Sequence, residues 1–245
     1  MTSASAARRP TSSFVPAGGN HDTLVVVPMY NEGPVITQTV AGLRGEFANV
    51  LCVDDGSSDD SARLAANAGA MVVRHPTNLG QGAALQTGFV FALRTRVSYV
   101  VTFDADGQHL ASDALRMLDL ARRGDADVVL GSRFQAPARA VPLLRRWLLR
   151  AGVLFTRATT GLDVTDTHNG LRVLTDSALG VMDLRLHGMA HASEILGTVA
   201  RHGLRYVEVP MTVVYSDYSR AKGQSGVNAV NIVVDLLLAR ARYAR

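Results

Sequence analysis

Residues 23–55, TLVVVPMYNEGPVITQTVAGLRGEFANVLCVDD, contain the pattern that decides the fold. Val-rich apolar runs at 23–30 and 49–55 flank a helix-like segment at 33–46. Runs that are apolar throughout are typical of strands covered on both faces, and two such strands joined by a helix form a parallel βαβ unit. The stretch therefore predicts an α/β fold.

The same alternation continues toward the C-terminus. Helix-like segments and Val-rich runs follow one another at residues 58–69, 70–75, 81–94, 98–106, 111–124 and 127–133. We expect a Rossmann-like three-layer sandwich, with helices on both faces of a mostly parallel central sheet. The 245 residues show no internal repeat and no linker that would separate a second large domain.

The composition describes an ordinary globular protein. Hydrophobic residues make up 47% and charged residues 19% of the chain, which excludes disordered and fibrous classes. Cys52 is the single cysteine, so an internal disulfide is excluded and a buried thiol is expected. Residues 1–22, rich in Ser, Ala and Pro, are predicted to be a disordered N-terminal leader rather than a signal peptide.

The charge pattern indicates an anionic partner. The net charge is +4, and arginines cluster in two segments that otherwise contain many apolar residues, at 141–161 and 227–245. Both segments are predicted to be amphipathic helices, and the second either packs in the core or lies on a membrane.

No window approaches the roughly 20 apolar residues of a membrane span. We therefore expect a cytoplasmic protein, peripheral at the inner face of the cytoplasmic membrane, with an anionic membrane surface or a small membrane-protein partner. No nucleic-acid partner is expected, because the chain lacks motifs for one. Between the two basic segments the sequence predicts a polar turn, a helix, a strand and a loop, at 163–172, 191–203, 204–215 and 216–226.

An acidic pair follows the fourth apolar run. Asp104 and Asp106, in FDADGQHL at residues 103–110, are two positions apart, so their side chains point to the same side and converge. Two carboxylates suffice for magnesium or manganese when water and phosphate oxygens complete the site, and Gln108 adds a neutral oxygen. The alternative is a helix cap or a solvated turn, because a lone D-x-D is common.

The other polar clusters also follow strands, at the edge where open α/β sheets bind ligands. Asp54 and Asp55 in VDDGSSDD suit hydrogen bonds to a base or ribose, while the residues after them suit a helix cap. Gly80 and Gly82 at a helix start offer free N–H groups to an anion or close approach to a nucleotide. The chain lacks G-x-G-x-x-G and the P-loop motif, which counts against a dehydrogenase and a P-loop enzyme.

Basic side chains occur in turns beside Gly or Ser, a setting that suits phosphate oxygens. They are Arg133, Arg172, Arg220 and Lys222. The alternative is that each is a solvated surface charge. His187 and His191 have the i, i+4 spacing of a zinc site, but no further ligand is evident, so we expect them on a helix surface.

Seven motifs occur in order between about Leu24 and Ser225: VVVPMYNE, VDDGSSD, NLGQGAALQTGF, DADGQH, GSRF, DTHNGLR and RAKGQS. In this order they resemble the inverting family 2 glycosyltransferases of the GT-A fold, especially dolichyl-phosphate mannose synthase and other polyprenyl-phosphate glycosyltransferases. The resemblance implies a GT-A catalytic domain over residues 23–226. One departure is HNGLR, residues 168–172, where relatives often have S-G-F-R.

The resemblance also implies the roles of individual residues. The nucleotide would be bound by Pro28, Tyr30, Glu32, Asp54, Asp55, Gly80, Gly82 and Asp104. The metal, Mg²⁺ or Mn²⁺, would be held by Asp104, Asp106 and Gln108. The acceptor or the donor diphosphate would be bound by Arg133, Arg172, Arg220, Lys222 and Ser225. The catalytic set would be Asp104, Asp106, Arg133, Asp166 and Arg172.

The implied activity is that of a hexosyltransferase, which moves a sugar from a UDP- or GDP-sugar to a polyprenyl phosphate or a related cell-envelope glycan, with inversion. A lipid phosphate is already anionic and needs no strong base, whereas a sugar hydroxyl needs one; Asp166 and Glu194 are the candidates. The alternatives are a transferase that acts on a sugar hydroxyl in polysaccharide synthesis and a noncatalytic nucleotide-sugar-binding subunit. A nucleotidyltransferase is disfavoured, because PMYNEG stands where its Gly-rich loop would follow the first strand.

Overall fold

The computed structural model of the protein describes residues 19–133, 153–154, 156–186, 188, 190–214 and 218. Along the chain, they form β1 (Thr23–Met29), α1 (Gly33–Glu46), β2 (Asn49–Asp54), α2 (Ser61–Asn67), β3 (Met71–Arg74), α3 (Gln81–Thr95), β4 (Tyr99–Thr102), α4 (Ala111–Arg122), β5 (Val128–Ser132), β6 (Arg172–Thr175), α6 (Asp176–Leu179), α7 (His191–Arg201) and β7 (Tyr206–Pro210). The leader up to residue 18 and the predicted helix at 227–245 lie outside the described residues. Of the predicted helix at 141–161, residues 153–154 and 156–161 are described, and all but residue 161 are helical.

The seven strands of the described chain belong to one sheet, in the order β3-β2-β1-β4-β6-β5-β7. β1 pairs in parallel with β2 and β4, β2 with β3, and β5 with β7, whereas β6 is antiparallel to both β4 and β5. The carboxyl ends of parallel strands lie at the same edge of the sheet. The predicted α/β fold with a mostly parallel sheet is therefore confirmed.

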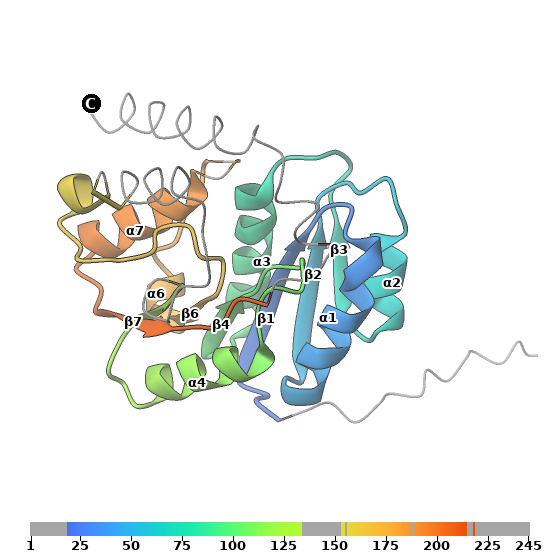
Figure 1. The fold of residues 1–245 in the computed structure, drawn as a ribbon, viewed down its shortest axis with the longest axis horizontal. Coiled ribbons are helices and arrows are strands. Elements are labelled where there is room, and N and C mark those ends of the chain that lie inside the picture. The colour runs from blue at the N-terminus through green and yellow to red at the C-terminus, as the bar shows by residue number, and fades with distance from the viewer. Residues whose placement is uncertain are drawn as a thin grey trace, which may run out of the picture.

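Helices cover both faces of the sheet, which gives three layers (Figure 1). In β1, Val25 and Val27 pack into the core beneath α1, α2 and α4, whereas Leu24 and Val26 pack into the core beneath α3, α6 and α7. Successive residues of a strand point to opposite faces, so each strand supplies two separate cores. This explains why the central strands are apolar on both faces rather than at every second position.

Neither β6 nor the short helix α6 is predicted from the sequence. β6 has four residues, RVLT, directly after the polar turn at 163–172, and lacks the length of the other apolar runs. It pairs with β4 from Tyr99↔Thr175 to Thr102↔Arg172. This antiparallel insertion places the basic side chain of Arg172 beside the acidic end of β4.

Residues 19–22, which precede the predicted start of the domain, contact two helices. The side chain of Asn20 donates to the carbonyl oxygen of Glu46 at 2.9 Å, and Asp22 forms an ion pair with Arg122 at 2.6 Å. These contacts attach residues 19–22 to the ends of α1 and α4. The prediction of disorder is therefore wrong for these four positions.

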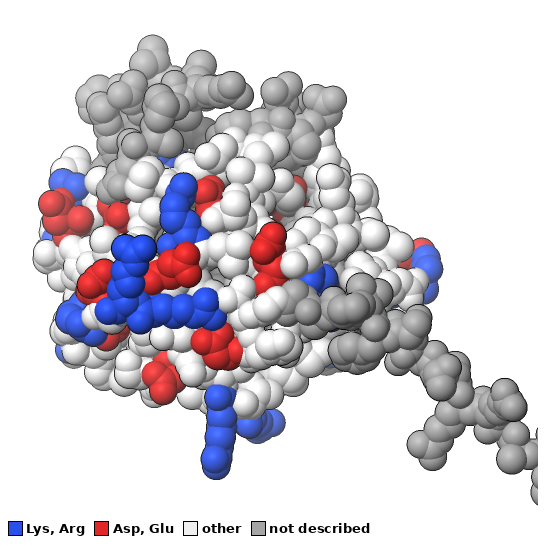
Figure 2. All heavy atoms as spheres, turned by 90° about the horizontal axis from the view of Figure 1, so that it is seen from below, with Lys and Arg blue, Asp and Glu red and all other residues white. Residues whose placement is uncertain are grey.

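The surface of the described chain has mixed charge. On the face shown in Figure 2, basic and acidic side chains are interleaved. Ion pairs join Arg205 to Asp127 and Arg116 to Asp113, each at 2.8 Å. Most arginines of the two basic segments lie outside the described residues. No helix among the described residues has the length and hydrophobicity needed to span a bilayer.

Candidate active site

Acidic side chains lie at or just after the carboxyl ends of three neighbouring strands. Glu32 follows β1, Asp54 ends β2, and Asp104 and Asp106 follow β4. Burial, and then the negative charges of Asp104 and Glu32, raise the pKa of Asp106 to about 6. Charges shift a pKa in this way at short range. The structure thus brings the two predicted metal ligands together with Glu32.

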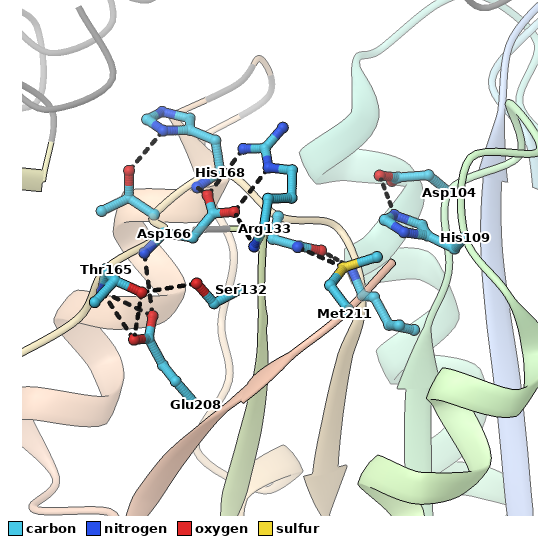
Figure 3. A network of polar contacts seen from close by, with 12 residues as sticks. Asp104, His109, Ser132, Arg133, Thr165, Asp166, His168, Glu208 and Met211 are labelled. Carbon is cyan, nitrogen blue, oxygen red and sulfur yellow. Dashed lines mark hydrogen bonds and ion pairs between the residues drawn. The ribbon is translucent and has the colours of Figure 1, made fainter. Parts of the chain in front are cut away.

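Asp104 is held by three separate parts of the chain. Gln81 at the start of α3 donates to Oδ1 at 3.1 Å. His109 Nε2 lies 3.0 Å from Oδ2 (Figure 3). The Cα of Gly170 packs directly on the carboxylate, where a Cβ would collide with both oxygens. Burial alone would raise the pKa of Asp104, but the hydrogen bond and charge of His109 and the charge of Arg172 outweigh it and lower that pKa. Asp104 is therefore ionised and fixed in orientation.

The acidic pair fits a divalent cation that takes most of its ligands from water and substrate. The described residues include no group of three or more His, Cys, Asp or Glu side chains that could hold a metal alone. Mg²⁺ sites that serve phosphates need only one or two carboxylates. Burial first, and then the charges of Asp104 and Glu32, raise the pKa of Asp106, and a bound cation would oppose both effects. Gln108, the third predicted ligand, donates its backbone N–H to Asp106 Oδ1 at 3.0 Å.

Asp55, predicted to contact the base or ribose, is buried and engaged within the protein. Its carboxylate accepts from Leu79 N at 2.9 Å and from Gly80 N at 2.7 Å, and it lies 2.8 Å from His75 Nδ1. The other ring nitrogen of His75 lies 2.9 Å from Thr87 Oγ1. The prediction that Gly80 offers a free N–H is wrong, because Asp55 accepts its hydrogen bond.

Other parts of the protein also contact Asp54 and Gly82. Asp54 is fully buried, accepts from Ser57 N at 3.0 Å and lies 3.1 Å from Arg74 Nε. A Cβ on Gly82 would collide with the carbonyl oxygen of Leu186. This glycine therefore permits close approach of the protein's own chain, whereas the sequence-based interpretation gave that space to a nucleotide.

The end of β1 carries the other predicted nucleotide contacts. Pro28 is buried within β1, and Tyr30 is 44% exposed. Glu32 is buried, and its Oε2 accepts a hydrogen bond from the Tyr218 hydroxyl at 2.8 Å. Burial and this hydrogen bond raise the pKa of Tyr218, so the phenol keeps its proton. A residue of the predicted loop at 216–226 thus contacts Glu32, just after β1.

Two of the predicted basic residues lie near the acidic pair. Arg133, directly after β5, binds both oxygens of Asp166, with Nε–Oδ2 at 2.7 Å and Nη2–Oδ1 at 2.8 Å (Figure 3). Arg172 is 3% exposed, and within the described part of the chain its Nη1 has no hydrogen-bond partner. Burial lowers the pKa of Arg172 to about 10, against the opposing effect of Asp104, so the guanidinium is charged at neutral pH. A buried cation with an unpaired nitrogen is suited to bind an anion.

Neither candidate base is suited to accept a proton. Burial alone would raise the pKa of Asp166, but the charge and hydrogen bonds of Arg133 outweigh it and lower that pKa. Glu194 is buried, and its Oε2 accepts from the backbone N–H groups of Arg185 and Leu186 at 2.9 Å each. The remaining predicted acceptor ligands, which lie outside the described residues, are Arg220, Lys222 and Ser225.

His191 is buried in α7, so the prediction that it lies on a helix surface is wrong; His187 lies outside the described residues. The Nδ1 atom of His191 lies 2.8 Å from the carbonyl oxygen of Gly188. Burial, followed by the positive charge of Arg172, lowers the pKa of His191 to about 4. A histidine in the unfolded chain titrates near pH 6.5. Between these values the unfolded state binds more protons, so stability falls as the pH falls.

Replacing His191 with Asn should weaken this pH dependence. The Asn amide can donate to Gly188 in place of Nδ1, but it does not titrate. Between pH 6.5 and pH 4, the slope of the unfolding free energy should decrease by about 1.4 kcal/mol per pH unit. Urea unfolding across this range measures the slope, with the exposed His202→Asn variant as control. An unchanged slope would show that His191 is charged in the folded protein.

Sequence reasoning missed three residues that orient polar groups of the site. Gln81 and His109 bind Asp104, and Glu208 in β7 accepts from the backbone N–H of Asp166 at 3.1 Å. His109 belongs to the DADGQH motif, five residues after Asp104, so proximity was a usable signal. Glu208 is 42 residues from Asp166, and no local pattern connects them.

Known sequences are similar to this chain over most of its length. The model of the family "Glycosyl transferase family 2" matches residues 24–180, more than half of the chain. A UDP-N-acetylglucosamine–dolichyl-phosphate N-acetylglucosaminyltransferase from Methanococcus voltae is 29% identical, over 87% of this chain and 94% of its own length. An undecaprenyl-phosphate mannosyltransferase from Micrococcus luteus is 32% identical, over 83% of this chain and 88% of its own.

Solved structures share the fold. The glucosyl-3-phosphoglycerate synthase of Mycobacterium tuberculosis matches with a TM-score of 0.66 at 22% identity, over 89% of this chain and 80% of that one. Its complex with Mn²⁺ and UDP-glucose matches with a TM-score of 0.64 at 18% identity, over 91% and 84%. These neighbours have the GT-A fold. From the family match and the shared fold, we conclude that the chain belongs to glycosyltransferase family 2.

Proposed function

We propose that the protein is a metal-dependent, inverting glycosyltransferase that moves a hexose from a UDP- or GDP-sugar to polyprenyl phosphate. The observation that carries the proposal is the place of Arg172, which lies opposite Thr102 at the end of β4 with an unpaired, buried Nη1. The site thus combines a carboxylate pair for a cation-bound diphosphate with a buried cation for a second phosphate. A lipid phosphate acceptor would supply that second phosphate.

The names of similar proteins support both substrates. The Methanococcus voltae relative is named for a UDP-sugar donor and a dolichyl-phosphate acceptor, and the Micrococcus luteus relative for an undecaprenyl-phosphate acceptor. The Mycobacterium tuberculosis structures contain UDP with Mg²⁺ or UDP-glucose with Mn²⁺. We favour a uridine donor. The reaction would take place at the inner face of the cytoplasmic membrane, where a nucleotide sugar meets a lipid phosphate.

On the donor side, Asp104 and Asp106, with Gln108, would hold Mg²⁺ or Mn²⁺. When bound, the ion would offset the charge that develops on the leaving nucleoside diphosphate. Gln81 and His109 keep the Asp104 carboxylate in one orientation before substrate arrives. A ligand that needs no reorientation during the reaction stabilises the transition state more effectively.

On the acceptor side, Arg172 and Arg133 would bind the phosphate and direct its oxygen to the face of the sugar opposite the leaving group, which gives inversion. The phosphate oxygen is already anionic, so no side chain has to remove a proton. This agrees with Asp166, whose carboxylate binds Arg133 at both oxygens. A hydroxyl acceptor, in contrast, would need a base that neither Asp166 nor Glu194 is placed to supply.

Sugar transfer by the purified full-length protein in detergent micelles tests the proposal. Radiolabelled UDP- and GDP-hexoses are supplied with Mn²⁺ and undecaprenyl phosphate, and the label is measured in the organic phase. We expect labelled lipid with one nucleotide class and none with chelator. The Arg172→Gln variant should bind the nucleoside diphosphate but lose transfer, and the exposed Arg94→Gln variant should keep both.

Two other results would replace the proposal. Label that appears in a water-soluble glycan would identify a hydroxyl acceptor in polysaccharide synthesis. Nucleotide-sugar binding without transfer to any acceptor would identify a noncatalytic binding subunit.

A further inference from the structure

A carboxylate in β7 supports the turn that carries Asp166. Glu208 accepts hydrogen bonds from the backbone N–H of Thr165 at 2.9 Å, from the Thr165 hydroxyl at 2.8 Å and from the backbone N–H of Asp166 at 3.1 Å (Figure 3). Three donors from two consecutive residues thus converge on one side chain. A carboxylate is suited to this arrangement because both of its oxygens accept hydrogen bonds. An amide has only one oxygen, and its NH₂ group would face the N–H and O–H donors of the turn.

The same turn is fixed from β5. Ser132 Oγ lies 2.7 Å from Thr165 Oγ1. β5 and β7 pair in parallel with Leu130 opposite Glu208, so both supports of the turn belong to adjacent strands of the sheet. Side chains held by rigid strands are positioned more precisely than those held by loops.

The next contacts lead from the turn to Arg133. Asp166 is buried, and it binds Arg133 through the two side-chain contacts already described and through the backbone N–H of Arg133 at 3.1 Å. A two-point contact between guanidinium and carboxylate fixes the plane of both groups. The orientation of the Arg133 guanidinium therefore depends on where the turn places Asp166, and Glu208 is the side chain that binds Asp166 and Thr165 from β7.

The far end of the turn is anchored to the same part of the chain. Asn169 Nδ2 lies 2.7 Å from the sulfur of Met211, just after β7, and Asn169 Oδ1 accepts from Leu171 N at 2.9 Å. Residues 165–171 are thus attached at both ends to β7 or its continuation. They lead directly into Arg172 at the start of β6.

We propose that Glu208 is a positioning residue for sugar transfer, which acts through Thr165 and Asp166 on the orientation of Arg133. Glu208 makes no contact with substrate in this assignment. It sets the geometry of the guanidinium that receives the acceptor phosphate, so the kinetic part of the inference rests on the proposed function. The structural part, the dependence of Arg133 on Glu208, does not.

The Glu208→Gln variant tests the structural part without any activity assay. The Nε–H of Arg133 donates to Asp166, and a fixed, bonded Nε–H gives a distinct cross-peak in an arginine-selective ¹⁵N–¹H spectrum; its loss in Arg133→Lys assigns it. We expect this cross-peak to broaden or shift toward the position of exposed arginines in Glu208→Gln. The exposed Glu46→Gln variant should leave it unchanged. An unchanged cross-peak in Glu208→Gln would overturn the proposal.

Transfer kinetics test the functional part. In Glu208→Gln, kcat/KM for the lipid phosphate should fall about 10- to 100-fold, while the affinity for the nucleoside diphosphate stays the same. In the Arg133→Lys background the same substitution should cost less than about twofold, because its effect passes through Arg133. Losses that multiply in the double variant, or equal losses for donor and acceptor, would contradict a positioning role.

The two proposals can fail separately. If the Arg133 cross-peak changes in Glu208→Gln but the wild-type protein transfers no sugar to any lipid phosphate, the positioning of Arg133 by Glu208 is upheld and the proposed function is overturned. If the wild-type protein transfers sugar to lipid phosphate but Glu208→Gln changes neither the cross-peak nor the kinetics, the proposed function is upheld and the positioning role of Glu208 is overturned.

Discussion

Replacing Asp106 with Asn should abolish sugar transfer and at the same time stabilise the metal-free protein at neutral pH. The amide keeps the size of the side chain and an oxygen for the backbone N–H of Gln108, which Asp106 Oδ1 now accepts at 3.0 Å. It does not keep the negative charge that a divalent cation requires. We expect transfer to decrease by at least about 100-fold, the loss typical when one charge-stabilising contact is removed from an active site.

The gain in stability follows from the sign of the pKa shift. Burial, with Asp104 and Glu32, raises the pKa of Asp106 to about 6 in the folded protein, compared with about 3.9 in an unfolded chain. The contribution of Asp106 to stability is therefore fully present below about pH 4 and is lost as the pH rises to about 6. A shift of this size corresponds to at most about 3 kcal/mol. Asn carries no charge at any pH, so the variant should be about 1–3 kcal/mol more stable than the wild type near pH 7.

Urea unfolding at pH 7.5 with chelator measures the stability, and the micelle assay with Mn²⁺ measures transfer. Asp119→Asn, on the exposed face of α4, is the matched control and should change neither. If Asp106→Asn were active, the metal assignment would be wrong. If it were inactive but less stable than the wild type, the inference that ionised Asp106 destabilises the metal-free protein would be wrong.

The Gly170→Ala substitution should reduce sugar transfer by a similar factor, although it changes no charged side chain. The new methyl group would collide with the carboxylate of Asp104. The backbone cannot withdraw freely, because Thr102 Oγ1 donates to the carbonyl oxygen of Gly170 at 2.6 Å. Asp104 must therefore leave the orientation that Gln81 and His109 define. A displacement of about 1 Å in such a group costs on the order of 100-fold in rate.

Mn²⁺ titration and transfer kinetics measure this effect, with the melting temperature as a check on folding. Gly180→Ala is the matched control: Gly180 ends α6 with φ −60°, and a Cβ there would lie 3.5 Å from the carbonyl oxygen of Asp176, an ordinary contact. We expect the control to behave as the wild type. Wild-type metal affinity and rate in Gly170→Ala would show that the Asp104 carboxylate has room to move without loss of function.

The parts of the fold that local pattern determines could be predicted from the sequence. The segment at 33–46 is α1 with the same bounds, because its apolar spacing and the turn residues around it are local signals. β6 could not be predicted in this way. Its four residues become a strand because β4 and β5 lie on either side of it, and that neighbourhood is set by the whole sheet.

The candidate site shows the same division. The proximity of Asp104 and Asp106 followed from their spacing of two residues. The strand geometry used to predict it was wrong, because β4 ends at Thr102 and both residues lie after it. The backbone donors to Asp55, at Leu79 and Gly80, come from the loop between β3 and α3, so local pattern did not show that the carboxylate is bound within the protein. His191 has a helical neighbourhood that pattern alone assigned to the surface, but tertiary packing buries it.

The hydrogen bond from Tyr218 to Glu32 joins the end of β1 to the segment at 216–226. Glu32 lies beside the proposed nucleotide site, and Tyr218 belongs to the stretch of sequence with the predicted acceptor ligands. If a bound nucleotide strengthens this bond, then the bond must strengthen nucleotide binding by the same factor, because coupling free energies are reciprocal. Nucleotide binding would then favour the bonded position of Tyr218, and that position would favour nucleotide binding. Because such coupling is symmetric, it would impose no order of binding; the phenol hydroxyl of Tyr218 would instead make each substrate raise the affinity of the protein for the other.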